Sequence, residues 1–152
     1  MAEEGARLPD RDAYLYAEMI VLDRAQGAPR ATMEEHFRKA LSIDAGCLLA
    51  YKAKTSFLLP RWHGEPGDLK TFAEQTVKDT GNHKIYASIA VWICYYGANE
   101  VKMSGLEWPK LKKGFTELLK VYPDEMYTRN AFALCAVVHK DRATAGPVFK
   151  SI

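Results

Sequence analysis

The sequence predicts an all-α fold. Apolar residues recur at spacings of three and four along almost the whole chain, which is typical of helices that bury one face. No segment keeps the strict apolar and polar alternation of a half-buried strand. Glycine and proline fall between the periodic segments, where they end helices. We expect a flexible N-terminus over 1–9, followed by a single helical domain over 10–152 with about eight helices.

The first two helices are predicted from their capping signals. Asp10 or Asp12 can cap a helix that runs to about Gln26, where a Gly-Ala-Pro sequence ends it. Thr32 and the glutamate three residues later have the spacing of a capping box, in which each side chain accepts a hydrogen bond from the other residue's backbone N–H. A second helix is therefore expected from Thr32 to about Ser42.

Prolines and a glycine set the limits of the next two helices. A third helix is expected from about Ala45 to Leu59, because Pro60 cannot continue the backbone hydrogen bonding. A fourth begins near Pro66, since proline suits the first helical position, and Gly81 ends it as a C-cap.

The fifth helix, from about Asn82 to Lys102, is the most apolar, so we expect it to contact neighbours on several sides. Its apolar part, Ile85 to Ala98, is shorter than the roughly 20 residues of a membrane-spanning helix, and we expect no membrane association. Three further helices are expected from about Pro109 to the sequence VYPDE, from about Glu125 to His139, and from Asp141 to the end.

Phenylalanines recur at a spacing that indicates a helical repeat. Phe115 and Phe149 are 34 residues apart, which is the period of a tetratricopeptide repeat. Phe37, Phe72 and Phe115 are separated by 35 and then 43 residues, so the repeat is irregular. Ala145 lies four residues before Phe149, where a small residue lets the next helix approach. This pattern predicts tetratricopeptide-like stacked antiparallel helix pairs in a right-handed α-superhelix.

Two segments, LLPRWHGEPGDLKTFAEQ and the last 31 residues, resemble an uncharacterised family of bacterial tetratricopeptide-like proteins with a Pro-Arg-Trp-Gly-type loop. His63 stands where the family often has glycine. The resemblance covers about 37–152 and implies a fold rather than a reaction. The matching residues are Pro60, Arg61, Trp62 and Gly64 in the loop, and Asn130, Phe132, Ala133, Asp141, Arg142, Ala145 and Phe149 near the C-terminus.

The loop has two interpretations. Trp62 is expected to be a buried plug between the third and fourth helices, with Arg61 donating to a helix C-terminus or to a carboxylate. In this interpretation Pro60, Trp62 and Gly64 are structural. In the alternative, Arg61, Trp62 and His63 clamp an anionic or aromatic ligand.

Residues that could carry chemistry are scattered along the chain. The histidines have no second histidine or cysteine at a metal-ligand spacing, so no metal is expected. Cys135 and His139 lie one helical turn apart without an orienting third group, and no phosphate-binding glycine loop occurs, so we expect neither an enzyme nor a cofactor. Cys47, Cys94 and Cys135 each lie in an apolar helical pattern, which is typical of reduced core thiols. These thiols, together with the absence of a secretion signal, predict a cytoplasmic location.

The predicted function is that of a non-catalytic module that binds a protein or peptide in a concave helical groove. A net charge of +2 is too small for a nucleic-acid partner. The alternatives are a structural homodimer or other homo-oligomer formed through the many aromatic residues and, further, an enzyme or small-ligand site around Arg61, Trp62 and His63. The groove candidates, on the third, fifth and seventh expected helices, are Tyr51, Lys54, Tyr95, Asn99, Tyr127 and Asn130.

Overall fold

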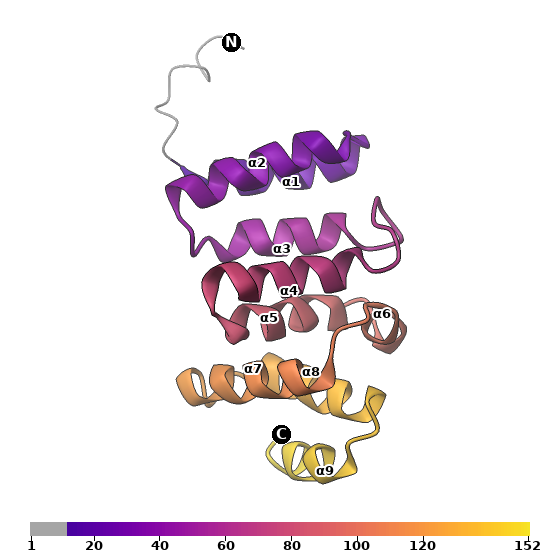
Figure 1. Cartoon of the computed structure of the whole chain (residues 1–152). Coiled ribbons are helices and arrows are strands. Elements are labelled where there is room, and N and C mark those ends of the chain that lie inside the picture. Colours follow the sequence, from indigo (N-terminus) through magenta and orange to yellow (C-terminus); the bar gives the residue numbers. More distant parts are fainter. Residues whose placement is uncertain (1–11) are drawn as a thin grey trace. The chain divides into compact units, whose positions relative to one another are not determined.

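The computed structural model describes residues 12–152, and this range contains helices and loops without a strand (Figure 1). The all-α prediction is therefore confirmed, with nine helices in the described range instead of eight. The predicted flexible segment over 1–9 and the alternative cap Asp10 lie outside the described residues. The helices are α1 (Ala13–Gln26), α2 (Arg30–Ile43), α3 (Leu48–Phe57), α4 (Asp68–Thr80), α5 (His83–Cys94), α6 (Ala98–Met103), α7 (Trp108–Val121), α8 (Met126–Val138) and α9 (Arg142–Lys150).

Contacts between helices group the chain into two compact units. Unit 1 extends to Phe57 and contains α1, α2 and α3, whereas unit 2 extends from Leu58 to Ile152 and contains α4 to α9. Each unit is described separately below. The one-domain organisation over 10–152 and the superhelical stacking of helix pairs stay predictions.

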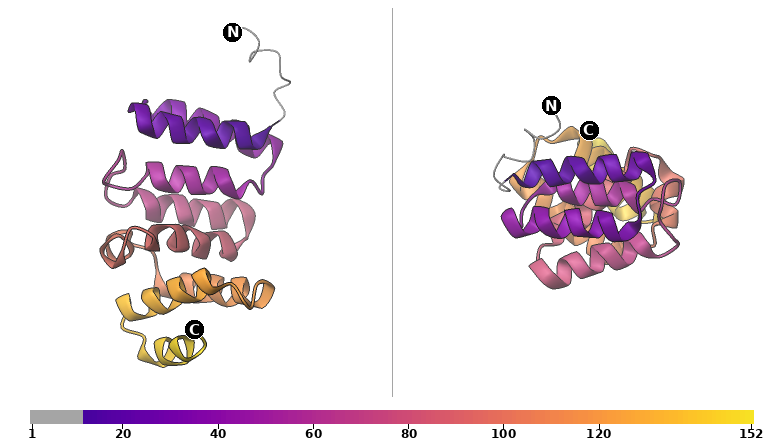
Figure 2. Two further views of the ribbon diagram at one scale, coloured as in Figure 1. Left: turned by 180° about the vertical axis from the view of Figure 1, so that it is seen from behind. Right: turned by 90° about the horizontal axis from the view of Figure 1, so that it is seen from above.

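Unit 1 is a three-helix cluster in which α1 packs on both α2 and α3 (Figure 2). Asp12 caps α1 as expected, because its carboxylate accepts a hydrogen bond from the backbone N–H of Tyr14 at 2.9 Å. The predicted capping box of α2 is wrong, because the helix already begins at Arg30 after an extended Pro29, which places Thr32 inside the first turn. Between the helices, His36 Nδ1 lies 2.7 Å from Asp23 Oδ2, and both side chains are nearly buried.

Unit 2 is built around α5, which packs against α4, α6, α7 and α8. The most apolar helix therefore has several neighbours, as its sequence predicts. The contact between α5 and α7 buries large side chains completely. They are Tyr86, Ile89 and Ile93 of α5, and Leu111 and Phe115 of α7.

The helix predicted over 82–102 is interrupted, and this prediction is wrong. It starts as expected, with Asn82 accepting from the N–H of Lys84 at 3.0 Å, but α5 ends at Cys94. Gly97 then has a φ of 110°, a conformation that favours glycine because a Cβ atom would crowd the residue's own backbone. The turn before Gly97 redirects the chain, so that α6 begins at Ala98 as a separate short helix that contacts α8.

Two buried helix faces of unit 2 approach each other closely at Gly114 on α7. A Cβ atom at this position would lie 2.2 Å from the carbonyl oxygen of His83 and 2.8 Å from Cβ of Ala87, both on α5. Because glycine has no Cβ, α7 can pack this closely against α5.

The four phenylalanines whose spacing predicts a repeat differ in their burial. Phe37, Phe72 and Phe115 are buried, and the ring of Phe115 stacks on that of Phe132 with centroids 4.9 Å apart. Phe149 is instead 56% exposed, so the expected interlocking of Ala145 with Phe149 is wrong. Within the described residues α9 packs extensively only on α8, so much of its surface is exposed.

Candidate partner-binding surface

Two of the six groove candidates are core residues of unit 1. Tyr51 is 2% exposed, and its ring packs edge to face on Phe37 with centroids 5.4 Å apart. Lys54 is 8% exposed; its Nζ lies 2.6 Å from Oε2 of Glu34 and 4.3 Å from the ring centroid of Phe37. Both side chains therefore hold α3 against α2, and the expected role as exposed anchors does not fit their burial.

The other four candidates are exposed residues of unit 2. Tyr95 follows the last residue of α5 and is 76% exposed, whereas Tyr127 in the first turn of α8 is 48% exposed. Asn99 lies on α6 and Asn130 on α8, and both are exposed. Because α8 contacts both α5 and α6, these four residues come from neighbouring elements. We call them the tyrosine–asparagine surface.

Tyr95 and Tyr127 lie close enough to influence each other electrostatically. The pKa of the Tyr127 hydroxyl is raised above its usual value, first by partial desolvation and then by nearby Cys94, Tyr95 and Glu125. The ring of Tyr95 also meets that of Tyr96 edge to face, with centroids 5.3 Å apart. The two exposed tyrosines thus share one region of unit 2.

The α8 side of this surface is fixed by a capped helix start. The carboxylate of Glu125 accepts hydrogen bonds from the backbone N–H groups of Tyr127 and Thr128. The pKa of Glu125 is lowered first by the side chain of Thr128 and then by these backbone bonds. The guanidinium of Arg129 donates to the carbonyl oxygens of Pro123 and Ser151, which ties the start of α8 to the end of α9. Tyr127 therefore projects from an anchored turn.

The α5–α6 side is tied to the loop over 60–64, which connects α3 and α4. Arg61 Nη2 lies 3.3 Å from Oε1 of Glu100 on α6, and its guanidinium lies 5.1 Å from the ring centroid of Tyr96. This pairing agrees with the expectation that Arg61 donates to a carboxylate. Through Tyr96 and Glu100 the loop holds the turn that carries Tyr95 and leads into α6.

The remaining loop residues differ in their roles. Trp62 is 46% exposed, so the predicted buried plug is wrong. Pro60 is exposed and follows the end of α3 by three residues. Gly64 has a clear steric role, because a Cβ atom there would lie 1.8 Å from the carbonyl oxygen of the fully buried Leu58. The ligand-clamp alternative for Arg61, Trp62 and His63 stays a prediction.

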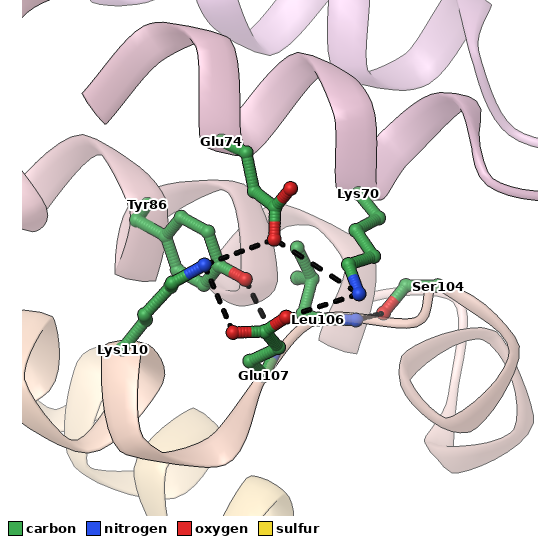
Figure 3. Close-up of polar contacts among 7 residues, drawn as sticks. All are labelled: Lys70, Glu74, Tyr86, Ser104, Leu106, Glu107 and Lys110. Atoms are coloured by element: carbon green, nitrogen blue, oxygen red, sulfur yellow. Dashed lines mark hydrogen bonds and ion pairs between the residues drawn. The ribbon is translucent and has the colours of Figure 1, made fainter. Parts of the chain in front are cut away.

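A four-charge network lies on another part of unit 2, between α4 and α7 (Figure 3). Glu107 pairs with Lys70 at 3.0 Å and with Lys110 at 2.8 Å, while Lys110 also reaches Glu74 at 2.9 Å. The backbone N–H of Glu107 donates to the hydroxyl of buried Tyr86 at 2.9 Å. The network therefore joins α4, α5 and the start of α7.

This network suits a structural role better than acid–base chemistry. The ammonium groups of Lys110 and Lys70 lower the pKa of Glu107 to about 2, and Glu107 and Glu74 raise that of Lys110. A carboxylate with so low a pKa is a weak proton acceptor near neutral pH. The two positive and two negative charges also cancel, so the cluster presents no net charge to a ligand.

Asp141 forms a second polar junction, which joins α9 to α7. Its carboxylate accepts from the hydroxyl of Thr144 at 2.7 Å and from the N–H of Thr144 at 3.0 Å at the start of α9. It also accepts from Nε1 of Trp108 at 2.9 Å and from Nζ of Lys112 at 3.1 Å. These donors hold the pKa of Asp141 well below its usual range, the hydroxyl of Thr144 having the largest effect.

This junction gives a pH-dependent prediction. Asp141→Asn is expected to lower the urea midpoint of unit 2 at neutral pH, because the neutral amide replaces a carboxylate that four donors stabilise. A depressed folded-state pKa stabilises the fold fully above the unfolded value of about 3.9, and this contribution disappears as the pH falls through the folded value. The midpoint difference between parent and variant should hold at about pH 5–7 and shrink below about pH 4. A difference that does not change with pH would contradict this assignment.

The side chains of Cys135 and His139, considered as a catalytic pair from the sequence, have different partners in the structure. The ring of His139 stacks on Trp108 with centroids 5.4 Å apart, and burial lowers its pKa. The thiol of Cys135 instead lies 3.9 Å from that of Cys94, across the α5–α8 contact. Cys47 and Cys135 are buried as expected, whereas Cys94 is partly exposed.

Residues 12–152 lack two further kinds of feature. No group of three or more histidine, cysteine, aspartate or glutamate side chains in this range has an arrangement that could hold a metal ion. None of the helices described is long and apolar enough to cross a membrane. Comparison of the chain with protein-family models, with curated proteins and with solved structures finds no match.

Proposed function

We propose that the protein is a non-catalytic interaction module that binds a peptide or protein segment on the tyrosine–asparagine surface of unit 2. The observation that carries this proposal is the exposure of two tyrosines, 76% for Tyr95 and 48% for Tyr127, on neighbouring elements. Tyrosine side chains give much of the binding energy of protein interfaces, because a rigid ring buries a large area at little entropic cost.

The asparagines complement the tyrosines. The amide of an asparagine both donates and accepts, so Asn99 and Asn130 can pair with the N–H and C=O groups of an extended peptide backbone. Apolar partner side chains would pack on the tyrosine rings. The caps and ion pairs around Glu125 and Arg61 support this surface, because they reduce the ordering that binding requires. We further propose that this module acts in the cytoplasm and has a tetratricopeptide-like arrangement of helices.

A second candidate is a homo-oligomer, favoured by exposed apolar residues on α1 of unit 1. Leu15 and Leu22 are seven residues apart, hence on one face of α1, and are 50% and 55% exposed. Self-association through this face predicts a mass that rises with concentration in light scattering, and that Leu15→Glu abolishes the rise. A constant monomer mass would contradict it and leaves the peptide proposal unaffected.

Peptide binding can be tested without knowledge of the natural partner. Peptides selected from a random display library against the immobilised full chain would be resynthesised, and their affinities measured by fluorescence anisotropy. We expect Tyr95→Ala and Tyr127→Ala each to weaken binding about tenfold or more, and Asn99→Ala with Asn130→Ala to weaken it severalfold. Tyr14→Ala, which removes a 57% exposed tyrosine from unit 1, is the matched control and should bind like the parent. Equal affinities for all variants would contradict the proposal.

A further inference from the structure

Cys94 and Cys135 form a thiol pair at the contact between α5 and α8. Their sulfur atoms are 3.9 Å apart, although the residues are far apart in the sequence. The thiol of Cys94 also lies 3.9 Å from the carbonyl oxygen of Ala131, which is one turn before Cys135 on α8. The Cys94 thiol therefore contacts the turn of α8 that runs from Ala131 to Cys135.

The pair is accessible on one side only. Cys135 is fully buried, whereas Cys94 is partly exposed and ends α5, immediately before the exposed Tyr95. Of the two thiols, that of Cys94 is therefore the one nearer to solvent, and the thiol of Cys135 lies beside it. Formation of a disulfide requires the two sulfur atoms to approach by about 1.9 Å. The position of Cys94 at a helix end, close to the turn at Gly97, leaves room for that adjustment.

We propose that Cys94 and Cys135 are a redox-modification site that hydrogen peroxide converts to an intramolecular disulfide. In the first step the thiolate of Cys94 attacks one oxygen of the peroxide, the O–O bond breaks, and Cys94 becomes a sulfenic acid. The other oxygen leaves as hydroxide and takes up the proton that the Cys94 thiol has given up, which gives water. In the second step the sulfur of Cys135 attacks that of Cys94, the S–O bond breaks, and the proton of Cys135 leaves with the hydroxide as a second water. Two thiols and one peroxide give one disulfide and two waters.

The order of the two steps follows from the environment of each sulfur. Cys135 donates a hydrogen bond to the Cys94 thiolate, which lowers the pKa of Cys94, and the same contact together with burial raises that of Cys135. Cys94 is thus the sulfur that meets the oxidant, and Cys135 is the sulfur that resolves the sulfenic acid. Cys47, a buried residue of unit 1, provides an internal reference.

The experiment is thiol counting and peptide mapping of the full chain after exposure to hydrogen peroxide. The parent is expected to lose two of its three thiols, to yield one cross-linked peptide pair containing Cys94 and Cys135, and to regain both thiols with dithiothreitol. Cys47→Ser should form the same cross-link. Cys135→Ser should stop at a sulfenic acid on Cys94 that dimedone traps, and Cys94→Ser should keep both remaining thiols.

Three results would overturn the proposal: unchanged thiols in the parent, oxidation of Cys94 to a sulfinic acid without a cross-link, or a cross-link that includes Cys47. The parent protein alone decides among these outcomes, so a variant that folds poorly does not weaken the test. Because the readout is covalent, it is also independent of whether the tyrosine–asparagine surface binds a peptide.

Discussion

Gly114→Ala is expected to destabilise unit 2 by about 2 kcal/mol or more, although alanine is the better helix former. Gly114 lies inside α7, where propensity alone predicts that alanine stabilises the helix by about 1 kcal/mol. The added Cβ would lie 2.2 Å from the carbonyl oxygen of His83, and a backbone atom cannot turn aside as a flexible side chain can. The sign of the effect therefore distinguishes close helix packing from local propensity.

Gly146→Ala is the matched control for this substitution. Gly146 lies inside α9, where an added Cβ meets no atom within 4 Å beyond its two neighbours in the chain. Because the ring of the following Pro147 crowds a Cβ in helical backbone, this offsets the better helix propensity of alanine, and stability should change by less than about 1 kcal/mol. Urea unfolding followed by tryptophan fluorescence is a suitable measurement, because all three tryptophans belong to unit 2. A Gly114→Ala protein as stable as Gly146→Ala would contradict the packing of α5 against α7.

Gly64→Ala is expected to cost about 2–3 kcal/mol for a different reason. Its Cβ would lie 1.8 Å from the carbonyl oxygen and 2.3 Å from the carbonyl carbon of Leu58. Leu58 and Leu59 are fully buried, and the N–H of Gly64 donates to the carbonyl oxygen of Leu59 at 3.2 Å. To relieve the overlap, the loop must give up that hydrogen bond or displace two core leucines.

The same fluorescence measurement tests Gly64→Ala, with the neighbouring Trp62→Phe as a control for effects on the probe. Trp62 is 46% exposed, so its replacement by phenylalanine should cost far less than the change at Gly64. If Gly64→Ala unfolds at the parent's midpoint, then the steric reason given for glycine in this loop is incorrect.

Local features of the fold are well predicted from the sequence, because they depend on residues a few positions apart. Asp12 caps α1, Gly81 ends α4 in a left-handed conformation and Asn82 caps α5, each as its chemistry predicts. The break after Cys94 cannot be predicted from the pattern, because apolar residues continue up to Gly97 although the helical backbone ends at Cys94.

Features that depend on which face of a helix points inward could not be predicted from periodicity. Tyr51 and Tyr95 both lie in apolar patterns of helical spacing. In the structure Tyr51 is buried against Phe37, whereas Tyr95 is 76% exposed. The Glu107–Lys110 pair is visible as an i,i+3 spacing, whereas the contacts of Lys110 with Glu74 and of Cys94 with Cys135 require the tertiary fold.

Hydrogen exchange of the full chain, with and without a selected peptide, tests the proposed binding surface most directly. The proposal predicts slower amide exchange on peptide binding in 95–99 and 126–130, which carry the tyrosine–asparagine surface, and unchanged exchange in α1 and α2 of unit 1. Protection confined to other segments, such as the 60–64 loop or α1, with 95–99 and 126–130 unaffected, would contradict it.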